Sequence, residues 1–357
     1  MRFGIYTEIQ CWPPASPGQL YGETLEQVVN ADRLGYDTYS VIEHYFWERF
    51  SISVDPLSFF AAAAQRTQRI VFRTLLHPLP LHNPAVLASR IAAAELVLGG
   101  RYEFGVGRGH AWLPPKAGVP LDETQERYEE ALEILFPALE QERFSYDGRF
   151  WRINDGHIVP RPTREFRVYV GGTSDATYER AAARGWGVVV PPLLPYQALE
   201  RQLDLYRAGC AERGHEPDIV WIHAVHLDQD RDTALREAEE GMTHFLRAQA
   251  VASPELAPAE ELRAAGYGFY AAGILDEVAA MPYADMVDGD YVWVGTPDEI
   301  AAKVQTVRDI CEGLSEIAIV ANAGGAKHWK AIKAQQLFAE RVMPHFRDHA
   351  AAEREQD

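Results

Sequence analysis

The chain has 357 residues, which is long enough for one large α/β barrel domain with insertions. Its 34 basic and 52 acidic residues give a formal charge of -18, which argues against a protein built to bind nucleic acid or an anionic membrane. The three cysteines lie far apart and in no metal-ligand spacing, as is typical of reduced thiols. We expect a cytoplasmic protein, because the sequence shows no basic-then-apolar leader and no apolar run approaches a membrane span.

Short apolar runs alternate with helical patterns along most of the chain. The first run, at 3–6, is followed by an aromatic, Pro-rich loop and by a helical pattern that ends at Gly35. The predicted strands are residues 3–6, 38–42, 70–76, 102–106, 168–170, 188–190, 220–225 and 317–320, with helices predicted at 25–34, 56–67, 84–98 and 123–139, among others. Eight strands with helical crossovers favour one closed, parallel (β/α)8 TIM barrel over an open doubly wound sheet, with functional sites at the strand C-termini.

Two segments interrupt this alternation. Residues 144–164 are rich in turn residues and aromatics, and residues 228–291 separate the seventh and eighth predicted strands. Long excursions over the mouth of a barrel are often lids or substrate walls. We therefore predict a single domain over 1–357 that contains an insertion, 228–291, with the role of a lid.

One segment has the form of an anion site. The run Val168-Tyr169-Val170 leads through two glycines into Thr173-Ser174-Asp175-Ala176-Thr177, which opens a helix. Free amides at the start of a helix attract anions, and Ser174 and Thr177 lie one helical turn apart, where they can add two hydroxyl donors. An ordinary N-cap after a strand explains the same residues, so the segment alone leaves both interpretations open.

Two other strand ends carry residues suited to chemistry. Glu43 and His44 follow the second strand, where their side chains should reach the barrel mouth, and such a histidine can be a general base, a proton donor to a cofactor or a packed residue. After the fourth strand, Gly105, Gly107 and Gly109 would let a flat ligand lie against backbone, and Arg108 supplies a charge for an oxygen anion. This run lacks the spacing of a dinucleotide fingerprint.

No metal site is predicted. His82 precedes Asn83-Pro84, where a helix start is a sufficient structural explanation, so we do not expect it to be a catalyst. His223 and His226 are three apart on a predicted strand and therefore face opposite sides.

Together these motifs resemble the bacterial luciferase-like flavin monooxygenases over nearly the whole chain. The segments that carry the resemblance are Glu43–Phe46, Gly100–Gly109, Gly172–Thr177 with Ala181–Gly185, Val294–Glu299 and Val342–Pro344. Each is weak alone, but their order and spacing match the family.

The resemblance implies a two-component enzyme. A separate reductase would deliver reduced FMN to the strand C-termini, and O2 would add to it as a peroxide that oxygenates a small, largely apolar organic molecule. Such a peroxide requires a dry, closed pocket. The resemblance also implies a homodimer.

By position, the resemblance assigns roles to individual residues. His44 matches the catalytic histidine beside the reactive edge of the flavin. The residues that would contact the cofactor are Glu43, Leu75, Leu76, Gly107, Arg108, Arg127, Gly172, Thr173, Ser174, Thr177 and Pro191. Among them Arg108, Ser174 and Thr177 would hold the phosphate, with Arg127 as a further candidate, and Leu75-Leu76 falls where the family often has a cis peptide.

Departures from the luciferase pattern leave alternatives open. Gly107 stands where luciferase has a reactive cysteine, Tyr45 replaces a second histidine, and Pro191-Pro192 replaces a Ser-Trp pair, so we do not expect light emission. A reduced deazaflavin could instead transfer hydride on the same fold, with His44 near the transfer site. A non-catalytic flavin-binding partner subunit is the third alternative.

Overall fold

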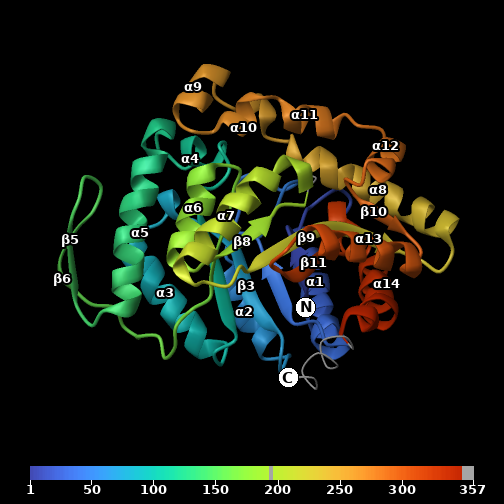
Figure 1. Cartoon of the computed structure of the whole chain (residues 1–357), viewed down its shortest axis with the longest axis horizontal. Coiled ribbons are helices and arrows are strands. Elements are labelled where there is room, and N and C mark those ends of the chain that lie inside the picture. Colours follow the sequence, from blue (N-terminus) through green and yellow to red (C-terminus); the bar gives the residue numbers. More distant parts are fainter. Residues whose placement is uncertain (193–195, 348–357) are drawn as a thin grey trace.

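The computed structural model describes residues 1–192 and 196–347. Eight parallel strands close into a barrel (Figure 1), and they correspond to the eight predicted from apolar runs. The barrel strands are β1 (Arg2–Thr7), β2 (Thr38–Val41), β3 (Val71–Pro78), β4 (Tyr102–Gly107), β7 (Val168–Gly171), β8 (Gly187–Val190), β9 (Ile219–Leu227) and β11 (Leu314–Val320). The ring closes because β11 pairs with β1 and β8 pairs with β9. The predicted TIM barrel is therefore confirmed.

Helices surround the barrel and follow local sequence signals. They are α1 (Pro17–Leu34), α2 (Pro56–Ala64), α3 (Pro84–Val97), α4 (Leu113–Lys116), α5 (Thr124–Glu140), α6 (Asp175–Arg184), α7 (Glu200–Arg213), α13 (Pro297–Ile310) and α14 (His328–Leu337). The Ser16 side chain caps α1 by accepting a hydrogen bond from the backbone N–H of Gln19, and Gly35 ends the helix with a φ of 86°. Thr296 and Glu299 form a reciprocal capping box at the start of α13.

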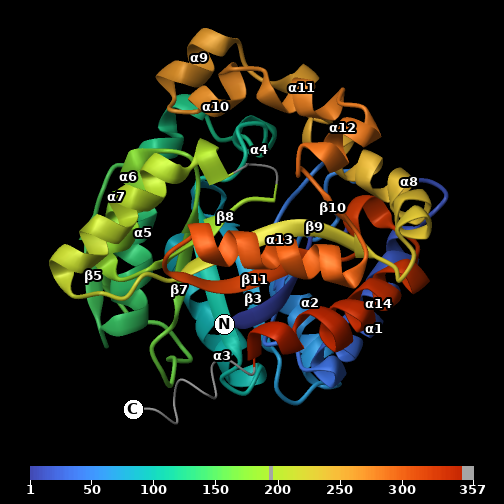
Figure 2. The ribbon, with the colours of Figure 1, turned by 45° about the vertical axis from the view of Figure 1, so that its right-hand side comes forward.

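The long insertion after β9 is mostly helical. It contains α8 (Arg231–Gln249), α9 (Ala259–Ala264), α10 (Gly268–Ala271), α11 (Ile274–Ala279) and α12 (Tyr283–Asp288). Figures 1 and 2 show α9–α12 together above one end of the barrel. A short strand that the sequence did not predict, β10 (Trp293–Gly295), then pairs with the end of β9, with Trp293 beside Val225. No helix in the described part of the chain has the length and apolar character needed to cross a membrane.

The other interruption is a hairpin. β5 (Phe144–Asp147) and β6 (Arg152–Gly156) pair antiparallel and project beside α5, at the left of Figure 1. Short helical elements complete the described structure. The 3-10 helices are η1 (Leu79–Leu81), η2 (Leu121–Glu123), η3 (Tyr196–Ala198), η4 (Ser253–Glu255) and η5 (Ala323–Gly325), and η6 (Phe338–Val342) is a π-helix.

A buried charge network fills the interior near the amino ends of the strands. The Arg73 side chain is fully buried, and its Nη2 lies 2.6 Å from Glu103 Oε2 and 2.9 Å from Glu316 Oε2. Arg2 adds a second guanidinium, 3.3 Å from Glu316. Paired charges of this kind tolerate burial, whereas a single one would not. This end of the barrel is thus packed, and the opposite end carries the cavity.

Candidate active site

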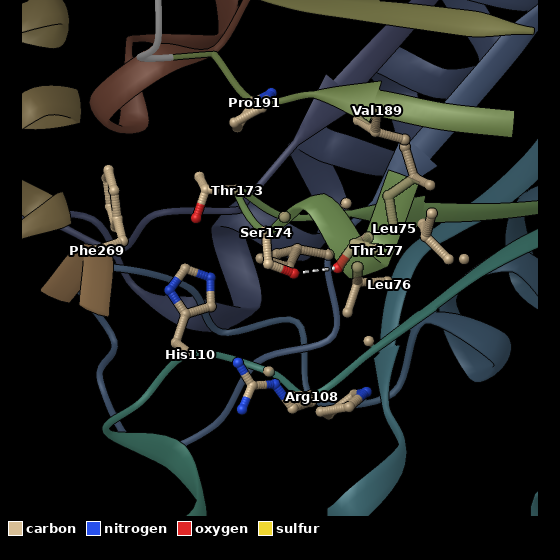
Figure 3. A pocket seen from close by; sticks show the side chains of 18 of the residues that line it. Leu75, Leu76, Arg108, His110, Thr173, Ser174, Thr177, Val189, Pro191 and Phe269 are labelled. Carbon is tan, nitrogen blue, oxygen red and sulfur yellow. Dashed lines mark hydrogen bonds between the residues drawn. The ribbon is translucent and has the colours of Figure 1, made fainter. Parts of the chain in front are cut away.

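A cavity of about 530 Å³ lies at the carboxyl ends of the barrel strands (Figure 3). Its wall takes residues from the ends of β1, β3, β4, β7 and β8 and from the insertion. The hydrophobic and aromatic side chains in the wall are Ile42, Leu75, Leu76, Trp112, Leu113, Val189, Ile222, Phe269, Tyr270 and Leu275. A concave, mostly apolar wall with a few polar groups is the usual form of a small-molecule site.

The insertion covers part of this cavity. Residues 266–270, from α10 and the turn before it, and Leu275, from α11, belong to the wall. In Figure 3 Phe269 stands across the cavity from Ser174 and Thr177. The insertion therefore has the position that a lid requires, while closure itself stays a prediction.

The turn between β7 and α6 provides hydroxyls to the cavity. Ser174 occupies the N-cap position of α6, but its side chain does not cap the helix. Its hydroxyl instead lies 2.9 Å from the hydroxyl of Thr177, and both side chains line the cavity. The ordinary N-cap explanation does not describe this serine. Gly172 and Thr173 also belong to the wall.

Two arginines reach the same corner. Arg108, after β4, donates to the carbonyls of Ala265 at 2.9 Å and Gly266 at 2.6 Å, and so ties the insertion to the barrel. Arg180, one turn beyond Thr177, lines the cavity as well and pairs with Glu129. The sequence did not single out Arg180, although its spacing of three from Thr177 on α6 was a usable signal.

Arg127, the further phosphate candidate, does not line the cavity. Its guanidinium pairs with Glu123 at 2.8 Å and lies 4.2 Å from the ring of Phe150. Glu123 is the N-cap residue of α5 and lies one helical turn before Arg127, so the pair forms locally at the start of this helix. In this structure Arg127 does not reach the corner lined by Ser174, Thr177, Arg108 and Arg180, and its role as a phosphate contact stays a prediction.

The third strand contributes two leucines to the wall. Leu75 and Leu76 are joined by a cis peptide bond, as the resemblance implied, and both line the cavity. The pairing of β3 with β4 shifts register between Thr74 and His77. A Cβ placed on Gly107 would lie 2.6 Å from Leu76 Cδ1, so this glycine makes room for the leucine as well as bordering the cavity. Pro191, after β8, is also in the wall.

Two histidines stand near the cavity, and the one in its wall is His110. Burial lowers the pKa of His110 to about 4, and its Nδ1 is buried with no hydrogen-bond partner among the described residues. Figure 3 shows its ring pointing into the cavity. At neutral pH the imidazole is uncharged, so it can accept a proton or a hydrogen bond.

His44 lies behind that wall. It is fully buried, it does not line the cavity, and its ring stacks on Phe50 with centroids 4.2 Å apart. Burial, and then the neighbouring His110, lower the pKa of His44 well below its usual value. The expectation that the His44 side chain reaches the barrel mouth therefore does not describe this structure.

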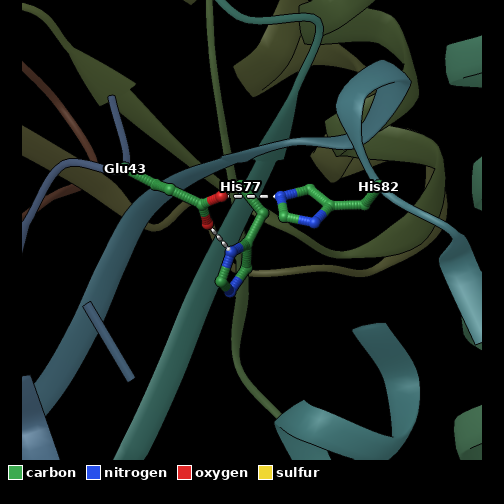
Figure 4. A group of neighbouring side chains, drawn as sticks. All are labelled: Glu43, His77 and His82. Atoms are coloured by element: carbon green, nitrogen blue, oxygen red, sulfur yellow. Dashed lines mark hydrogen bonds and ion pairs between the residues drawn. The ribbon is translucent and has the colours of Figure 1, made fainter. Parts of the chain in front are cut away.

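Glu43 also lines the cavity and is held by a group of hydrogen bonds (Figure 4). His77 Nδ1 and the Tyr45 hydroxyl contact its carboxylate, and His82 Nε2 lies 2.6 Å from Oε1. Burial alone would raise the pKa of Glu43, but the two histidines outweigh burial and hold it well below its usual range. The sequence did not predict that His77 and His82 would both bond to Glu43.

The same three residues have ligand types that metals use, and their ligand atoms lie within 4.8 Å of one another. Hydrogen bonds within the protein already use these ligand atoms. His77 Nδ1 and His82 Nε2 are each bonded to the Glu43 carboxylate, and the other ring nitrogen of His77 lies 2.9 Å from the Tyr102 hydroxyl. The cluster is complete as a network that fixes Glu43 in its ionised form.

A second carboxyl in the wall was not expected. Glu8 follows β1, is 4% exposed, and shares the wall with Tyr6 and Gln249. Burial raises the pKa of Glu8 to about 8, although hydrogen bonds from Gln249 and Tyr6 act in the other direction. Its position directly after the first predicted strand was the only signal in the sequence.

Comparison with known proteins places these features in context. The family model described as luciferase-like monooxygenase matches residues 1–311. Limonene 1,2-monooxygenase of Rhodococcus erythropolis is 23% identical over 332 residues, covering 91% of this chain and 81% of that protein. An F420-dependent glucose-6-phosphate dehydrogenase of Nakamurella multipartita is 24% identical, and the match covers 97% of both chains. An uncharacterised protein of Sinorhizobium fredii is 30% identical, but the chain spans only about half of its length, 51%.

Solved structures agree with the barrel. The monooxygenase RslO1 of Streptomyces bottropensis superposes with a TM-score of 0.80 at 27% identity, covering 97% of this chain and 100% of that one. The oxygenating constituent of 3,6-diketocamphane monooxygenase from Pseudomonas putida, solved in complex with FMN, has a TM-score of 0.78 at 22% identity, covering 96% and 98%. At 22% identity, the likeness to the 3,6-diketocamphane monooxygenase constituent concerns the fold alone.

Proposed function

The chain belongs to the luciferase-like monooxygenase family, and within it we propose a two-component flavin-dependent monooxygenase that oxygenates a small, largely apolar organic molecule. The family contains flavin- and F420-dependent oxidoreductases, so the chain is an oxidoreductase that uses a flavin or deazaflavin. Reduced FMN and O2 are our choice within that range, with a separate reductase as the source of reduced flavin.

The observation that carries this proposal is the corner between β7 and α6. The hydroxyls of Ser174 and Thr177 are directed at the cavity, and two guanidinium groups, Arg108 and Arg180, border the same space. Hydroxyls, cations and the start of a helix form a donor set that suits a phosphate. The residues present thus fit the phosphate of a flavin nucleotide.

The rest of the wall fits a flat ring and an apolar substrate. Leu75, Leu76 and Val189 offer an apolar surface next to the phosphate corner, and Trp112, Phe269 and Tyr270 lie on the insertion side. When bound, reduced FMN supplies the electrons, and together with O2 it supplies the oxygen atom that is transferred. The side chains of the insertion would exclude water from that space.

We assign the proton-handling position in this wall to His110. The neutral imidazole can accept a hydrogen bond from the cofactor or take a proton from a substrate, since burial disfavours its charged form. His44, one layer behind, would act as a positioning residue through Trp112, which donates to its Nε2.

Hydride transfer by a reduced deazaflavin is the second candidate. The observation that favours it is the set of F420-dependent relatives, one of which matches 97% of this chain. The phosphate corner suits either cofactor, because both carry a phosphate on a ribityl chain. The two functions differ in whether oxygen reacts with the bound cofactor.

Anaerobic titration separates them. The purified protein is titrated with reduced FMN and, separately, with reduced deazaflavin, and the complex is then mixed rapidly with oxygenated buffer while absorbance is recorded. We expect tighter binding of reduced FMN and a long-lived absorbing species before oxidised FMN appears. The Ser174→Ala/Thr177→Ala variant serves as the control that should weaken binding.

Two results would contradict the proposal. Preference for the deazaflavin would move the assignment to hydride transfer. Immediate reoxidation of FMN without a delayed phase, at saturating protein, would favour a flavin-binding partner subunit.

A further inference from the structure

The order of the barrel strands separates the two polar ends of the cavity. Around the closed ring β1-β2-β3-β4-β7-β8-β9-β11, β1 lies four strands from β7 in both directions. Glu8 follows β1, whereas Ser174 and Thr177 follow β7, and all three line the same cavity. A cofactor anchored by its phosphate beside β7 therefore leaves the β1 side of the cavity for another molecule.

The carboxyl group of Glu8 is held by neutral partners. Gln10 Nε2 donates to Oε2 at 3.0 Å, and Gln249 Nε2 lies 3.4 Å from the same oxygen. The other oxygen, Oε1, has the Tyr6 hydroxyl at a long 3.5 Å. Across the described ranges 1–192 and 196–347, the side chains bonded to Glu8 are those of Tyr6, Gln10 and Gln249, and no arginine, lysine or histidine forms an ion pair with it.

Burial without a cation favours the neutral acid, although the hydrogen bonds from Gln249 and Tyr6 act in the other direction. Tyr6 is the titratable group that contacts Glu8, and burial raises the pKa of Tyr6 well above its usual value, so it stays uncharged. Gln10 and Gln249 carry no charge at any pH. Burial without a cation raises the pKa of Glu8 to about 8 and leaves a carboxylic acid, which can donate a hydrogen bond, at neutral pH.

We propose that Glu8 is a substrate-binding residue whose carboxylic acid donates a hydrogen bond to the carbonyl oxygen of a neutral, otherwise apolar ketone or aldehyde. The assignment rests on the proposed function, because it takes the β7 side of the cavity for the cofactor. A neutral acceptor fits a buried acid donor, whereas an anionic substrate would find no cation beside Glu8.

The test compares three probes of one shape. They are 2-adamantanone, 2-methylideneadamantane, which replaces the oxygen by a CH2 group, and 2-aminoadamantane, which is cationic. Binding is followed by tryptophan fluorescence, with Trp112 in the cavity wall as the reporter, at about pH 6.5 and about pH 9.5. The measurements are made on the protein with and without bound FMN.

We expect the ketone to bind about fivefold to tenfold more tightly than the alkene at the lower pH, because one neutral hydrogen bond contributes that much. At the higher pH the acid is ionised and the preference disappears. Equal affinity for ketone and alkene, stronger binding of the amine, or no binding of any probe would each overturn the assignment.

Substitutions of Glu8 test whether this residue causes the preference for the ketone over the alkene. Glu8→Gln keeps a donor of the same shape and should retain the preference at both pH values, and Glu8→Leu should lose it at both. The matched control is Glu95→Gln, because Glu95 is also buried but lies outside the cavity wall and bonds to Thr163. A preference that survives in Glu8→Leu would overturn the assignment.

An infrared measurement tests the protonation state without any ligand. The difference spectrum between the two pH values should contain a carboxylic acid C=O band that is absent from Glu8→Gln and present in Glu95→Gln. Absence of this band from the wild-type protein would contradict the proposal. A separate result would show that the proposed function is wrong while this inference holds. In that case the protein would not bind FMN but would still distinguish the ketone from the alkene.

Discussion

The indole N–H of Trp112 donates to Nε2 of His44 at 3.0 Å, so the protein itself occupies a nitrogen of His44 that a ligand would otherwise contact. The remaining nitrogen, Nδ1, is buried and has no partner among the residues that the structure describes. Because Trp112 lies in the cavity wall and His44 does not, the contact joins a residue that borders the cavity to one that supports the wall from behind.

Substitution of the two histidines should therefore have unequal effects. We expect His110→Ala to lower turnover by about a hundredfold, the lower range for loss of an acid–base group, and His44→Ala to lower it much less. Turnover on a confirmed substrate and FMN affinity are measured for both variants. Near-complete loss of turnover in His44→Ala with a normal His110→Ala enzyme would restore the direct role implied by the family resemblance.

The hydroxyl pair of Ser174 and Thr177 at the start of α6 predicts a selective loss of FMN affinity in a variant that lacks it. Ser174→Ala/Thr177→Ala should weaken binding of FMN by about tenfold or more, because two hydrogen bonds to a charged phosphate are removed. Riboflavin has no phosphate, so its affinity should not change. Fluorescence titration with both ligands checks this, with Ser89→Ala on α3 as a control variant. An equal loss for riboflavin would contradict phosphate binding at this corner.

Glu8 should make stability depend on pH. Its pKa is about 8 in the folded protein and 4.5 for a free side chain, so its contribution is fully present below pH 4.5 and is lost as the pH rises through 8. Relative to wild type, Glu8→Gln should gain about 4 kcal/mol in the free energy of unfolding at pH 8 and nothing at pH 4. Urea denaturation at several pH values measures this, and a constant difference between the proteins would contradict it.

The charge network at the amino ends of the strands should be essential for stability. Arg73→Met leaves Glu103 and Glu316 buried without their main cation and should cost about 3–5 kcal/mol of unfolding free energy. The control is Arg152→Ala, because Arg152 and its partner Asp147 are both 82% exposed and should contribute about 0–1 kcal/mol. Chemical denaturation of both variants compares them, and a loss in Arg73→Met no larger than the control would contradict the prediction.

Most of the fold could be predicted from the sequence because barrel strands are short apolar runs bounded by helical patterns. All eight barrel strands followed this rule. β10 did not, because it is three residues long and exists only where its partner β9 extends past β11. Its three backbone pairings with β9 are set by tertiary structure, which a local pattern does not contain.

The site was harder to predict, since side-chain direction after a strand end depends on the turn that follows. β2 ends at Val41, and the chain then turns through Phe46, whose φ is 76°. The backbone N–H of His44 donates to the carbonyl of Ser53, and this loop directs the imidazole toward Phe50. Strand position alone therefore placed His44 in the mouth, and the same signal was too weak to single out Glu8.

The two hydrogen bonds of Arg108 to the insertion have a thermodynamic consequence. The guanidinium that borders the proposed phosphate corner also donates to Ala265 and Gly266, so the proposed cofactor site and the resting position of this segment share one group. Any change in those bonds when the phosphate arrives is a coupling free energy, and coupling is reciprocal. If residues 265–270 close over the cavity as predicted, the factor by which the cofactor favours their closed position equals the factor by which closure raises the affinity for the cofactor.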